Sequence, residues 1–210
     1  MKLLSATPSP YARKVRIALI EKGLPFELVT EVPWDASTST PRYNPLEKLP
    51  VLILDDGTSI YESSLILQYL ELTHPRPRLL PTGVAGIIAA RRVEVLCDGI
   101  CDAIILLFWE LKRPEACRSQ PWLARQRRKV DGGLNEVARL VGARDWAVGN
   151  AFGLADIAAG TLLRFLDIRF PELGWREKHP HLVDYSDRME TRPSFRQTTP
   201  RAQHFSDPVV

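Results

Sequence analysis

The pattern of apolar residues changes part-way along this chain, and the change limits the possible folds more than any other feature. Up to residue 73, short β-rich runs alternate with amphipathic segments, whereas beyond residue 84 apolar residues recur only at helical spacing. Between them, HPRPRLLPTG at residues 74–83 carries three prolines and is typical of a connector. We therefore expect two domains, an α/β domain over residues 1–78 and an all-helical domain over residues 84–210.

The first domain is predicted to have the element order β-α-β-β-β-α. KLLSA forms the first strand, and a helix follows over residues 10–22. Ser9 is a good N-cap residue, Pro10 suits the first helical position, and Gly23 suits the position just past the helix end. Signals at both ends therefore define this helix.

The remaining β-rich runs predict how the sheet is connected. FELVTEV follows the first helix, so a right-handed crossover makes it parallel to the first strand. LPVLIL and TSIY flank DDG, which predicts an antiparallel hairpin. A second helix is expected over residues 62–73, with Ser63 or Ser64 near its start. Residues 34–42 form a Ser/Thr-rich loop between prolines, so no second long helix is expected there.

The second domain is predicted to be a helical bundle. Its apolar residues have the spacing of one long helix followed by at least three others. The expected helices cover residues 86–112, 120–141, 154–170 and 179–190.

Composition is that of a globular protein, with 45% hydrophobic and 25% charged residues. No stretch approaches the roughly 18 uninterrupted apolar residues of a membrane span. The N-terminus MKLLSATPSP lacks the apolar centre of a signal peptide. We expect a cytoplasmic protein that does not bind a membrane.

The three cysteines, Cys97, Cys101 and Cys117, are too few for a secreted disulfide framework. Cys97 and Cys101 lie one helical turn apart, which fits two zinc ligands or two small buried side chains. Burial is favoured because no second Cys/His pair lies near them, so no metal is expected.

The charge pattern gives little support for nucleic-acid binding. The net charge is +3, from 28 basic and 25 acidic residues, and the one local basic run is RQRRK at residues 125–129. A solvated helix face explains this run at least as well, so no nucleic-acid partner is expected.

An ordered set of motifs resembles the cytosolic glutathione transferase family. It consists of the Ser-Pro-Tyr turn after the first strand, then NPLEKLPVL, YESSLIL and, in the helical domain, NAFGLADIAAG. The resemblance covers the whole chain. Within the family, the chain is similar to serine-type bacterial members whose substrates are poorly defined. It implies a thioredoxin-like N-terminal domain, glutathione as co-substrate, a homodimer, and transfer to a small hydrophobic electrophile, as in detoxification.

In this family setting, Ser9 is the expected catalytic residue. A free cysteine thiol has a pKa of about 8.5 and reacts as its thiolate, which a hydroxyl donor at a helix N-terminus stabilises. Ser9 is also a plain helix cap, and the two roles are compatible because a capping oxygen accepts while its proton is free. No cysteine stands at this turn, which disfavours thiol-disulfide exchange through the protein.

Five further residues are implied to bind glutathione. In similar proteins the proline corresponding to Pro50 follows a cis bond that turns the backbone of Leu49 toward the cysteinyl part, and Lys48 faces the glycine carboxylate. Glu62 would hold the γ-glutamyl ammonium and Ser63 the neighbouring carboxylate. Without the resemblance, these residues have ordinary explanations. Pro50 is an edge-strand proline, Lys48 is an exposed lysine, and Glu62 with Ser63 forms a helix start.

The electrophile pocket is expected to involve Tyr11, Trp34, Phe108 and Trp109. Core packing explains the same aromatic residues, and because Phe108 and Trp109 are adjacent on a helix, at most one is expected to face the pocket. Tyr11 is an alternative donor to the thiolate.

Two further points concern the helical domain. Asp98 and Asp102 are either additional partners for the ammonium, in one subunit or across a dimer, or solvated helix residues. The family's buried helix cap also departs from its usual form, because Gly153 stands where Ser or Thr is usual, three residues before Asp156. This raises doubt about the rigidity of that helix.

Two functions therefore remain open. The first is a glutathione transferase, and the second is a non-catalytic binder of glutathione or hydrophobic ligands, or an interaction scaffold, with the same fold. The presence of both Ser9 and the Glu-Ser pair favours the enzyme.

Overall fold

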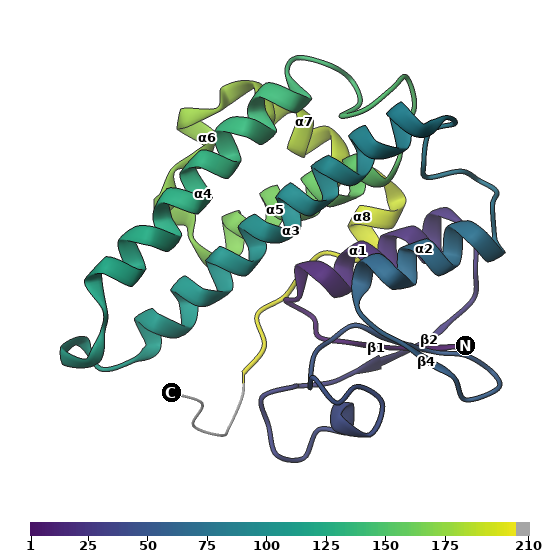
Figure 1. Ribbon diagram of the computed structural model, residues 1–210, viewed down its shortest axis with the longest axis horizontal. Helices are drawn as coiled ribbons and strands as arrows, with labels where there is room; N and C mark the ends of the chain where they lie inside the picture. Colours follow the sequence, from purple (N-terminus) through teal and green to yellow (C-terminus); the bar gives the residue numbers. More distant parts are fainter. Residues whose placement is uncertain (205–210) are drawn as a thin grey trace. The chain divides into compact units, whose positions relative to one another are not determined.

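The computed structural model describes residues 1–204 and divides into two compact units (Figure 1). The N-terminal unit contains residues 1–79 together with residues 192–204, and the helical unit contains residues 80–191. An α/β N-terminal domain and a helical C-terminal domain were both predicted, and this fold class is confirmed.

The N-terminal unit is built on a four-stranded sheet with the strand order β2-β1-β3-β4. Strand β1 pairs parallel with β2, and β3 pairs antiparallel with β4, as predicted. Strand β1 also pairs antiparallel with β3, a pairing that was not predicted. Helices α1 and α2 lie side by side against one face of the sheet (Figure 1). The elements are β1 (Lys2–Ser5), α1 (Pro10–Glu21), β2 (Glu27–Thr30), β3 (Val51–Ile53), β4 (Ser59–Ile60) and α2 (Ser63–Thr73), with a 3-10 turn, η1 (Thr40–Arg42), in the loop after β2.

The ends of helix α1 follow the sequence signals. Ser9 is the N-cap, Pro10 is the first helical residue, and Gly23 lies just past the end with a φ of 64°, which glycine adopts without strain. Lys22 closes the helix. Its buried ammonium forms an ion pair of 2.5 Å with Glu71 and donates to the carbonyl of His74 at 2.8 Å, so it ties α1 to the end of α2.

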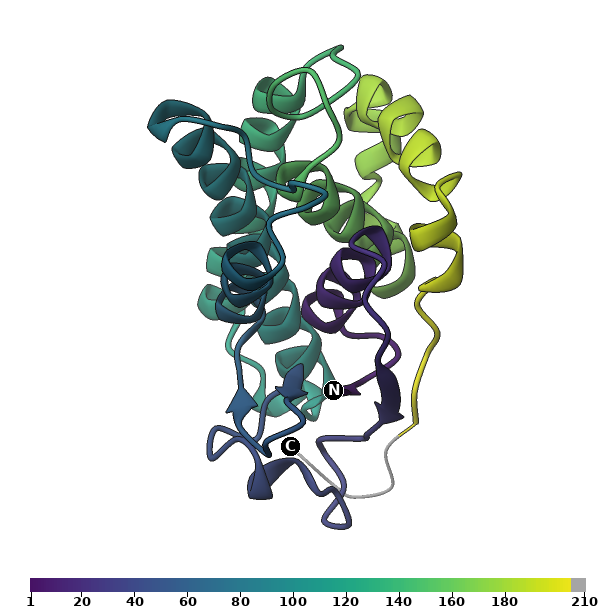
Figure 2. The same cartoon turned by 90° about the vertical axis from the view of Figure 1, so that its right-hand side faces the viewer.

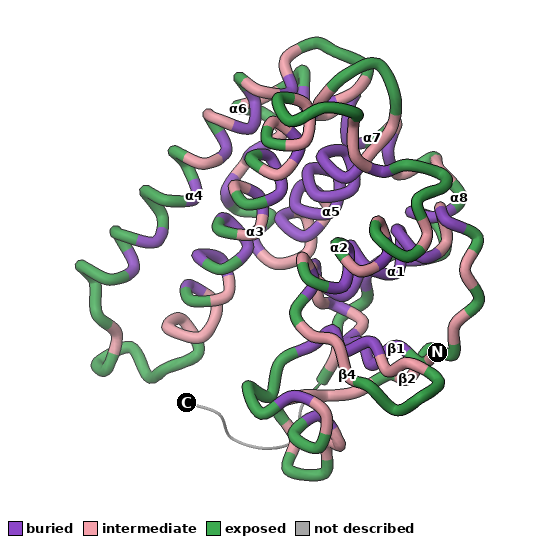
Figure 3. Tube along the Cα trace, turned by 45° about the vertical axis from the view of Figure 1, so that its right-hand side comes forward, coloured by how far each residue is buried: buried purple, intermediate pink, exposed green. Residues whose placement is uncertain are grey.

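The helical unit contains five α-helices and two short 3-10 turns within the described residues. These are α3 (Val84–Lys112), η2 (Glu115–Cys117), α4 (Gln120–Val141), α5 (Leu154–Arg169), η3 (Pro171–Leu173), α6 (Trp175–Lys178) and α7 (Pro180–Glu190). Helix α5 is buried along most of its length, whereas α4 has one buried face and one exposed face (Figure 3). Of these elements, η2, η3 and α6 were not predicted, because their short runs lack a measurable period.

Helices α3 and α4 approach closely where α4 carries two adjacent glycines. A Cβ atom added to Gly133 would lie 2.5 Å from Cγ1 of the buried Ile100, whereas one added to Gly132 would meet nothing within 4 Å. Glycine is therefore required at only one of these two positions.

We expect Gly133→Ala to lower the free energy of unfolding by about 1–2 kcal/mol, because overpacking against Ile100 outweighs the gain in helix propensity. Gly132→Ala should raise it by about 0.5–1 kcal/mol, because the exposed position gains only propensity. Urea unfolding of the two variants and wild type checks both signs. Equal effects at the two positions would contradict the close helix approach.

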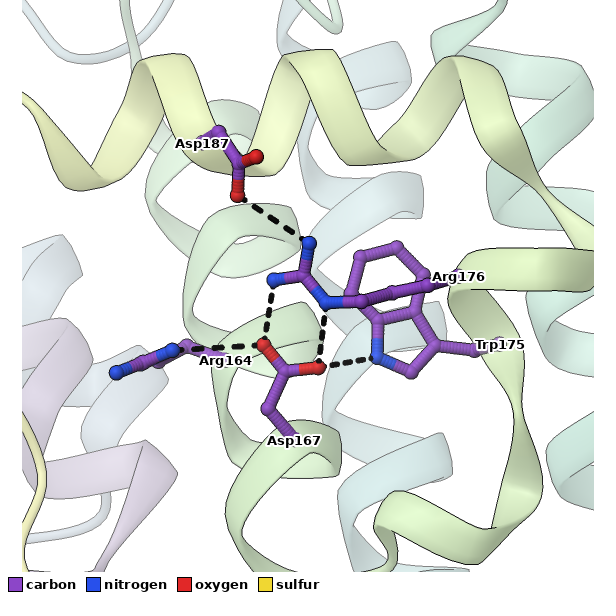
Figure 4. A network of polar contacts seen from close by, with 5 residues as sticks. All are labelled: Arg164, Asp167, Trp175, Arg176 and Asp187. Atoms are coloured by element: carbon purple, nitrogen blue, oxygen red, sulfur yellow. Dashed lines mark hydrogen bonds and ion pairs between the residues drawn. The ribbon is translucent and has the colours of Figure 1, made fainter.

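The carboxylate of Asp167 connects the last helices of this unit through a network of polar contacts (Figure 4). Asp167, near the end of α5, accepts from Nε1 of Trp175 at 2.8 Å and from Nη2 of Arg176 at 2.7 Å. Nη1 of Arg176 also donates to Asp187 of α7 at 3.3 Å. The pKa of Arg176 is raised by these acceptors, chiefly Asp167. The network fixes the short helix α6 between α5 and α7.

The last described segment differs from the predicted domain boundary, which assigned it to the helical domain. Helix α8 (Pro193–Gln197) and residues 198–204 belong to the N-terminal unit (Figure 2). Arg192 forms a bidentate ion pair with Glu21 of α1, at 3.1 and 2.9 Å. Ser194 donates to the same carboxylate at 2.5 Å. Arg13 donates to the carbonyl of Phe195 at 3.1 Å. These contacts between distant parts of the sequence attach the segment to α1.

Cys97 and Cys101 are both buried in helix α3, 1% and 3% exposed. Within residues 1–204, no three His, Cys, Asp or Glu side chains gather closely enough to hold a metal ion. Among the helices of the described residues, none combines the length and the apolar character needed to cross a membrane.

Candidate functional site

Three chain segments of the N-terminal unit meet at one end of the sheet. Leu4, at the end of β1, pairs with Val51, at the start of the antiparallel strand β3. Leu52 pairs in turn with Ile60, the last residue of β4. The turn that leads to α1, the loop that enters β3 and the turn that leads to α2 therefore leave the sheet at the same end.

The first segment presents Ser9 at the N-terminus of α1. Its Oγ accepts from the backbone N–H of Ala12 at 3.2 Å, and its side chain is half-buried. The hydroxyl proton has no acceptor among residues 1–204, so it can be donated to a ligand. The positive end of the α1 dipole lies at the same place.

The second segment brings Lys48, Leu49 and Pro50 to the start of β3. The Leu49–Pro50 bond is cis, as implied by the resemblance, and Leu49 is buried while Lys48 is exposed. Asn44, which was not identified from the sequence, holds this loop. It donates to the carbonyl of Lys48 at 2.8 Å and accepts from the N–H of Leu46 at 2.9 Å. The available signal was an Asn-Pro pair, which is typical of such turns.

The third segment places Glu62 and Ser63 at the start of α2. A serine cap was the ordinary explanation for this helix start, but Glu62 is the N-cap and accepts from the N–H of Ser64 at 3.0 Å and from its hydroxyl. The short side chain of Ser63, the first helical residue, is turned inward instead. Ser63 is 1% exposed, and its Oγ has no hydrogen-bond partner among the described residues.

A buried hydroxyl without a partner is costly, because burial removes its hydrogen bonds to water. Ser5, Thr161 and Ser186 have such hydroxyls too, so the position of Ser63 at the start of α2 is what distinguishes it. Ser63 sits beside an exposed carboxylate and at the positive end of a helix. This end of the sheet therefore places a buried hydroxyl and the first backbone N–H groups of α2, which suit an anion, beside the carboxylate of Glu62, which suits a cation.

The four aromatic residues assigned to an electrophile pocket lie in two groups. Tyr11 is the second residue of α1 and is partly buried, and Trp34 is exposed in the loop after β2. Phe108 and Trp109 belong to α3, with ring centroids 5.1 Å apart in an edge-to-face contact. Phe108 lines a cavity of the helical unit and Trp109 is not among its lining residues.

The helix cap in the NAFGLADIAAG motif is complete despite Gly153. Asp156 is fully buried and accepts from the backbone N–H groups of Gly153 at 2.9 Å and Ala147 at 2.8 Å. The hydroxyl of Tyr185 in α7 donates to it at 2.7 Å. Ala147 and Tyr185 therefore supply partners for Asp156 that the motif alone does not indicate.

The comparisons with known proteins agree with these motifs. Residues 8–73 match the family described as "Glutathione S-transferase, N-terminal domain", and residues 120–188 match "Glutathione S-transferase, C-terminal domain". The GST-like protein YibF of Escherichia coli, which is uncharacterised, is 34% identical over 95% of this chain and 98% of its own length. The chain belongs to the glutathione S-transferase family.

Solved glutathione S-transferases share the whole fold. The enzyme of Methylobacterium radiotolerans, crystallised with glutathione sulfonate, is 67% identical with a TM-score of 0.98 over 100% of this chain and 99% of that chain. The one from Methylobacillus flagellatus, with glutathione bound, is 39% identical with a TM-score of 0.91 over 95% and 99%. The family predicted from the motifs is confirmed.

Proposed function

We propose that this glutathione S-transferase family member binds glutathione at the described end of the sheet and activates its thiol for attack on a small electrophile. The observation that carries the proposal is the buried Ser63 hydroxyl, which lacks a partner and lies beside the exposed Glu62. Together they match a group that carries one carboxylate and one ammonium on the same carbon. The γ-glutamyl end of glutathione is such a group.

The remaining contacts follow the length of the tripeptide. Glu62 pairs with the ammonium, and Ser63 with the first N–H groups of α2 holds the neighbouring carboxylate. The backbone of Leu49 beside Pro50 holds the cysteinyl part, and Lys48 pairs with the glycine carboxylate. The electrophile site built from Tyr11, Trp34, Phe108 and Trp109 stays a prediction.

Ser9 would act on the sulfur. Its hydroxyl donates to the thiolate, and the α1 dipole adds to the effect. Lowering a thiol pKa by about two units requires roughly 2.7 kcal/mol of preference for the anion. One hydrogen bond to a charged acceptor contributes about 1.5–3 kcal/mol, so this donor together with the α1 dipole has an effect of the required size. The thiol proton leaves to solvent, the sulfur forms a bond to the electrophilic carbon, and the leaving group departs with the bonding electrons.

Titrating the thiolate ultraviolet absorbance of bound glutathione tests the proposal. We expect a pKa well below the roughly 8.5 of a free thiol. Binding without a shift would favour a non-catalytic glutathione binder, and absence of binding would favour a scaffold. The homodimer and the cytoplasmic location stay predictions.

A further inference from the structure

The segment that follows α8 reaches the turn that carries Ser9. Residues 198–204, here called the α8 extension, belong to the N-terminal unit, and Figure 2 shows them as the yellow chain that leaves α8. The extension contains no helix or strand, so side-chain contacts determine its position. These contacts join residues that are 172 to 194 positions apart in the sequence. No spacing rule relates such distant positions, so only the structure reveals them.

The start of the extension is anchored in the core of the unit. Phe195 and Thr198 are 0% and 2% exposed, and both contact the buried Arg13 of α1. Arg13 donates to the carbonyl of Phe195 at 3.1 Å and to the hydroxyl of Thr198 at 3.4 Å. Its guanidinium carbon also lies 5.2 Å from the centroid of the Phe195 ring. The extension therefore begins from a fixed point on α1.

The far end of the extension is fixed at the end of β2. Nε2 of Gln203 donates to the backbone carbonyl of Glu31 at 2.9 Å. The N–H of Glu31 donates to the carbonyl of Ser5 in β1 at 2.9 Å, so the acceptor continues the sheet. The carboxylate of Glu31 accepts from the hydroxyls of Thr38 and Ser39, at 2.6 and 2.5 Å. Gln203 is thus attached to a residue that is itself held on two sides.

Between these two anchors, the extension holds the turn that precedes α1. The hydroxyl of Thr7 donates to the carbonyl of Arg201 at 3.1 Å. Thr7 is the second residue of this turn, which the N–H of Ser9 closes by donating to the carbonyl of Ala6 at 3.2 Å. Only Pro8, whose ring fixes φ, separates Thr7 from Ser9. A displacement of Thr7 is therefore transmitted to Ser9 through a short, stiff connection.

The position of the Ser9 hydroxyl determines how well it donates. The N–H of Ala12 holds its oxygen from the helix side at 3.2 Å, and the turn holds Ser9 from the other side. A hydrogen bond weakens steeply as its geometry departs from the optimum, and a misplacement of about 1 Å caused by a distant change can cost about 100-fold in rate. Turns at the surface move unless contacts hold them. A tether on Thr7 therefore has a direct consequence for the donor.

We propose that the α8 extension positions the Ser9 hydroxyl for thiol activation, and that Thr7 is the residue through which it acts. The inference rests on the proposed function, since its target is the hydroxyl that donates to the thiolate. Thr7 acts through Ser9 and is a positioning residue. The proton donor at the sulfur remains Ser9.

Thr7→Val tests the tether, because it keeps the shape of the side chain and removes the donor. We expect the thiol pKa of bound glutathione to rise by about 0.5 unit, while the affinity of the protonated thiol form stays within about twofold. Thr7→Ser restores a hydroxyl and should recover the wild-type pKa. Thr199→Val is the matched control: it removes an exposed hydroxyl of the same extension, which donates to the carbonyl of Arg196 at 3.0 Å, and should leave the pKa unchanged.

A double-mutant cycle with Gln203→Ala tests whether the extension acts through Thr7. In the wild-type background, Gln203→Ala should raise the bound thiol pKa by no more than Thr7→Val does. In the Thr7→Val background it should add nothing, because the connection to the turn is already broken. Additive effects on the pKa would overturn the proposed route through Thr7.

Amide hydrogen exchange of the ligand-free protein separates a failure of this inference from a failure of the proposed function. The N–H groups of Ser9 and Ala12 should exchange about three- to tenfold faster in Thr7→Val than in wild type or Thr199→Val. If wild type lowers the thiol pKa and Thr7→Val leaves that pKa unchanged, the inference is wrong. Faster exchange in Thr7→Val, combined with an unshifted thiol pKa in wild type, would refute the proposed function but support the positioning of Ser9 by the extension.

Discussion

Asp156→Ala is expected to lower the free energy of unfolding by about 3–5 kcal/mol, because it leaves two buried donors and one partly buried donor without an acceptor. The donors are the N–H groups of Ala147 and Gly153 and the hydroxyl of Tyr185, all within 2.9 Å of the carboxylate. Glycine at position 153 cannot replace any of these bonds, since it has no side chain. Urea unfolding followed by circular dichroism measures the loss.

The pH dependence of this loss has a definite sign. Burial raises the pKa of Asp156 above its ordinary value of 3.8, although the hydrogen bonds from Ala147, Tyr185 and Gly153 oppose the shift. A carboxyl group with a raised pKa in the folded state contributes stability that is present below pH 3.8 and is lost as the pH rises through the folded pKa. The difference in the free energy of unfolding between wild type and Asp156→Ala should therefore become smaller as the pH rises from acid to neutral.

Two further variants give graded controls. Tyr185→Phe removes one donor and should cost about 1–2 kcal/mol, since Asp156 keeps its two backbone partners. Asp184→Ala removes an exposed carboxylate from α7, the helix that carries Tyr185. Its free energy of unfolding should stay within about 0.5 kcal/mol of wild type. If Asp156→Ala costs no more than Asp184→Ala, the carboxylate does not stabilise the start of α5.

Features that depend on residues close together in the sequence could be predicted from it. Helix α1 was predictable because Ser9, Pro10 and Gly23 act within a few residues of its ends. The pairing of β1 with β2 and that of β3 with β4 were predictable because crossover handedness and turn chemistry relate strands that are neighbours in the sequence. Both depend on residues that are close in the sequence.

Contacts between distant residues were not predictable in this way. The pairing of Arg192 with Glu21 moves α8 into the N-terminal unit, and no spacing rule relates two such distant positions. The inward turn of Ser63 depends on Glu62 taking the cap position, which the motif YESSLIL does not specify. The contact between Arg169 of α5 and the ring of Phe108 of α3 depends on how these two helices pack.

Ser9→Ala and Ser63→Ala are expected to separate thiol activation from binding. Ser9→Ala should raise the thiol pKa of bound glutathione by one to two units, about 1.4–2.7 kcal/mol, and leave the affinity of the protonated thiol form nearly unchanged. Ser63→Ala should weaken glutathione by roughly 10-fold to 100-fold and leave the bound pKa unchanged. Calorimetry measures the affinities and thiolate absorbance measures the pKa.

A loss of helix capping must be distinguished from a loss of thiolate stabilisation, because Ser9 also caps α1. Ser119→Ala is the matched control: Ser119 caps α4 through a bond from the N–H of Trp122 at 3.4 Å, so its removal costs a similar cap outside the glutathione site. It should change neither the bound pKa nor the affinity. Ser9→Thr keeps a hydroxyl donor and a cap, and should retain most of the pKa shift. If Ser9→Ala leaves the pKa of bound glutathione unchanged, then Ser9 is a cap alone and another donor, of which Tyr11 is the candidate, stabilises the thiolate.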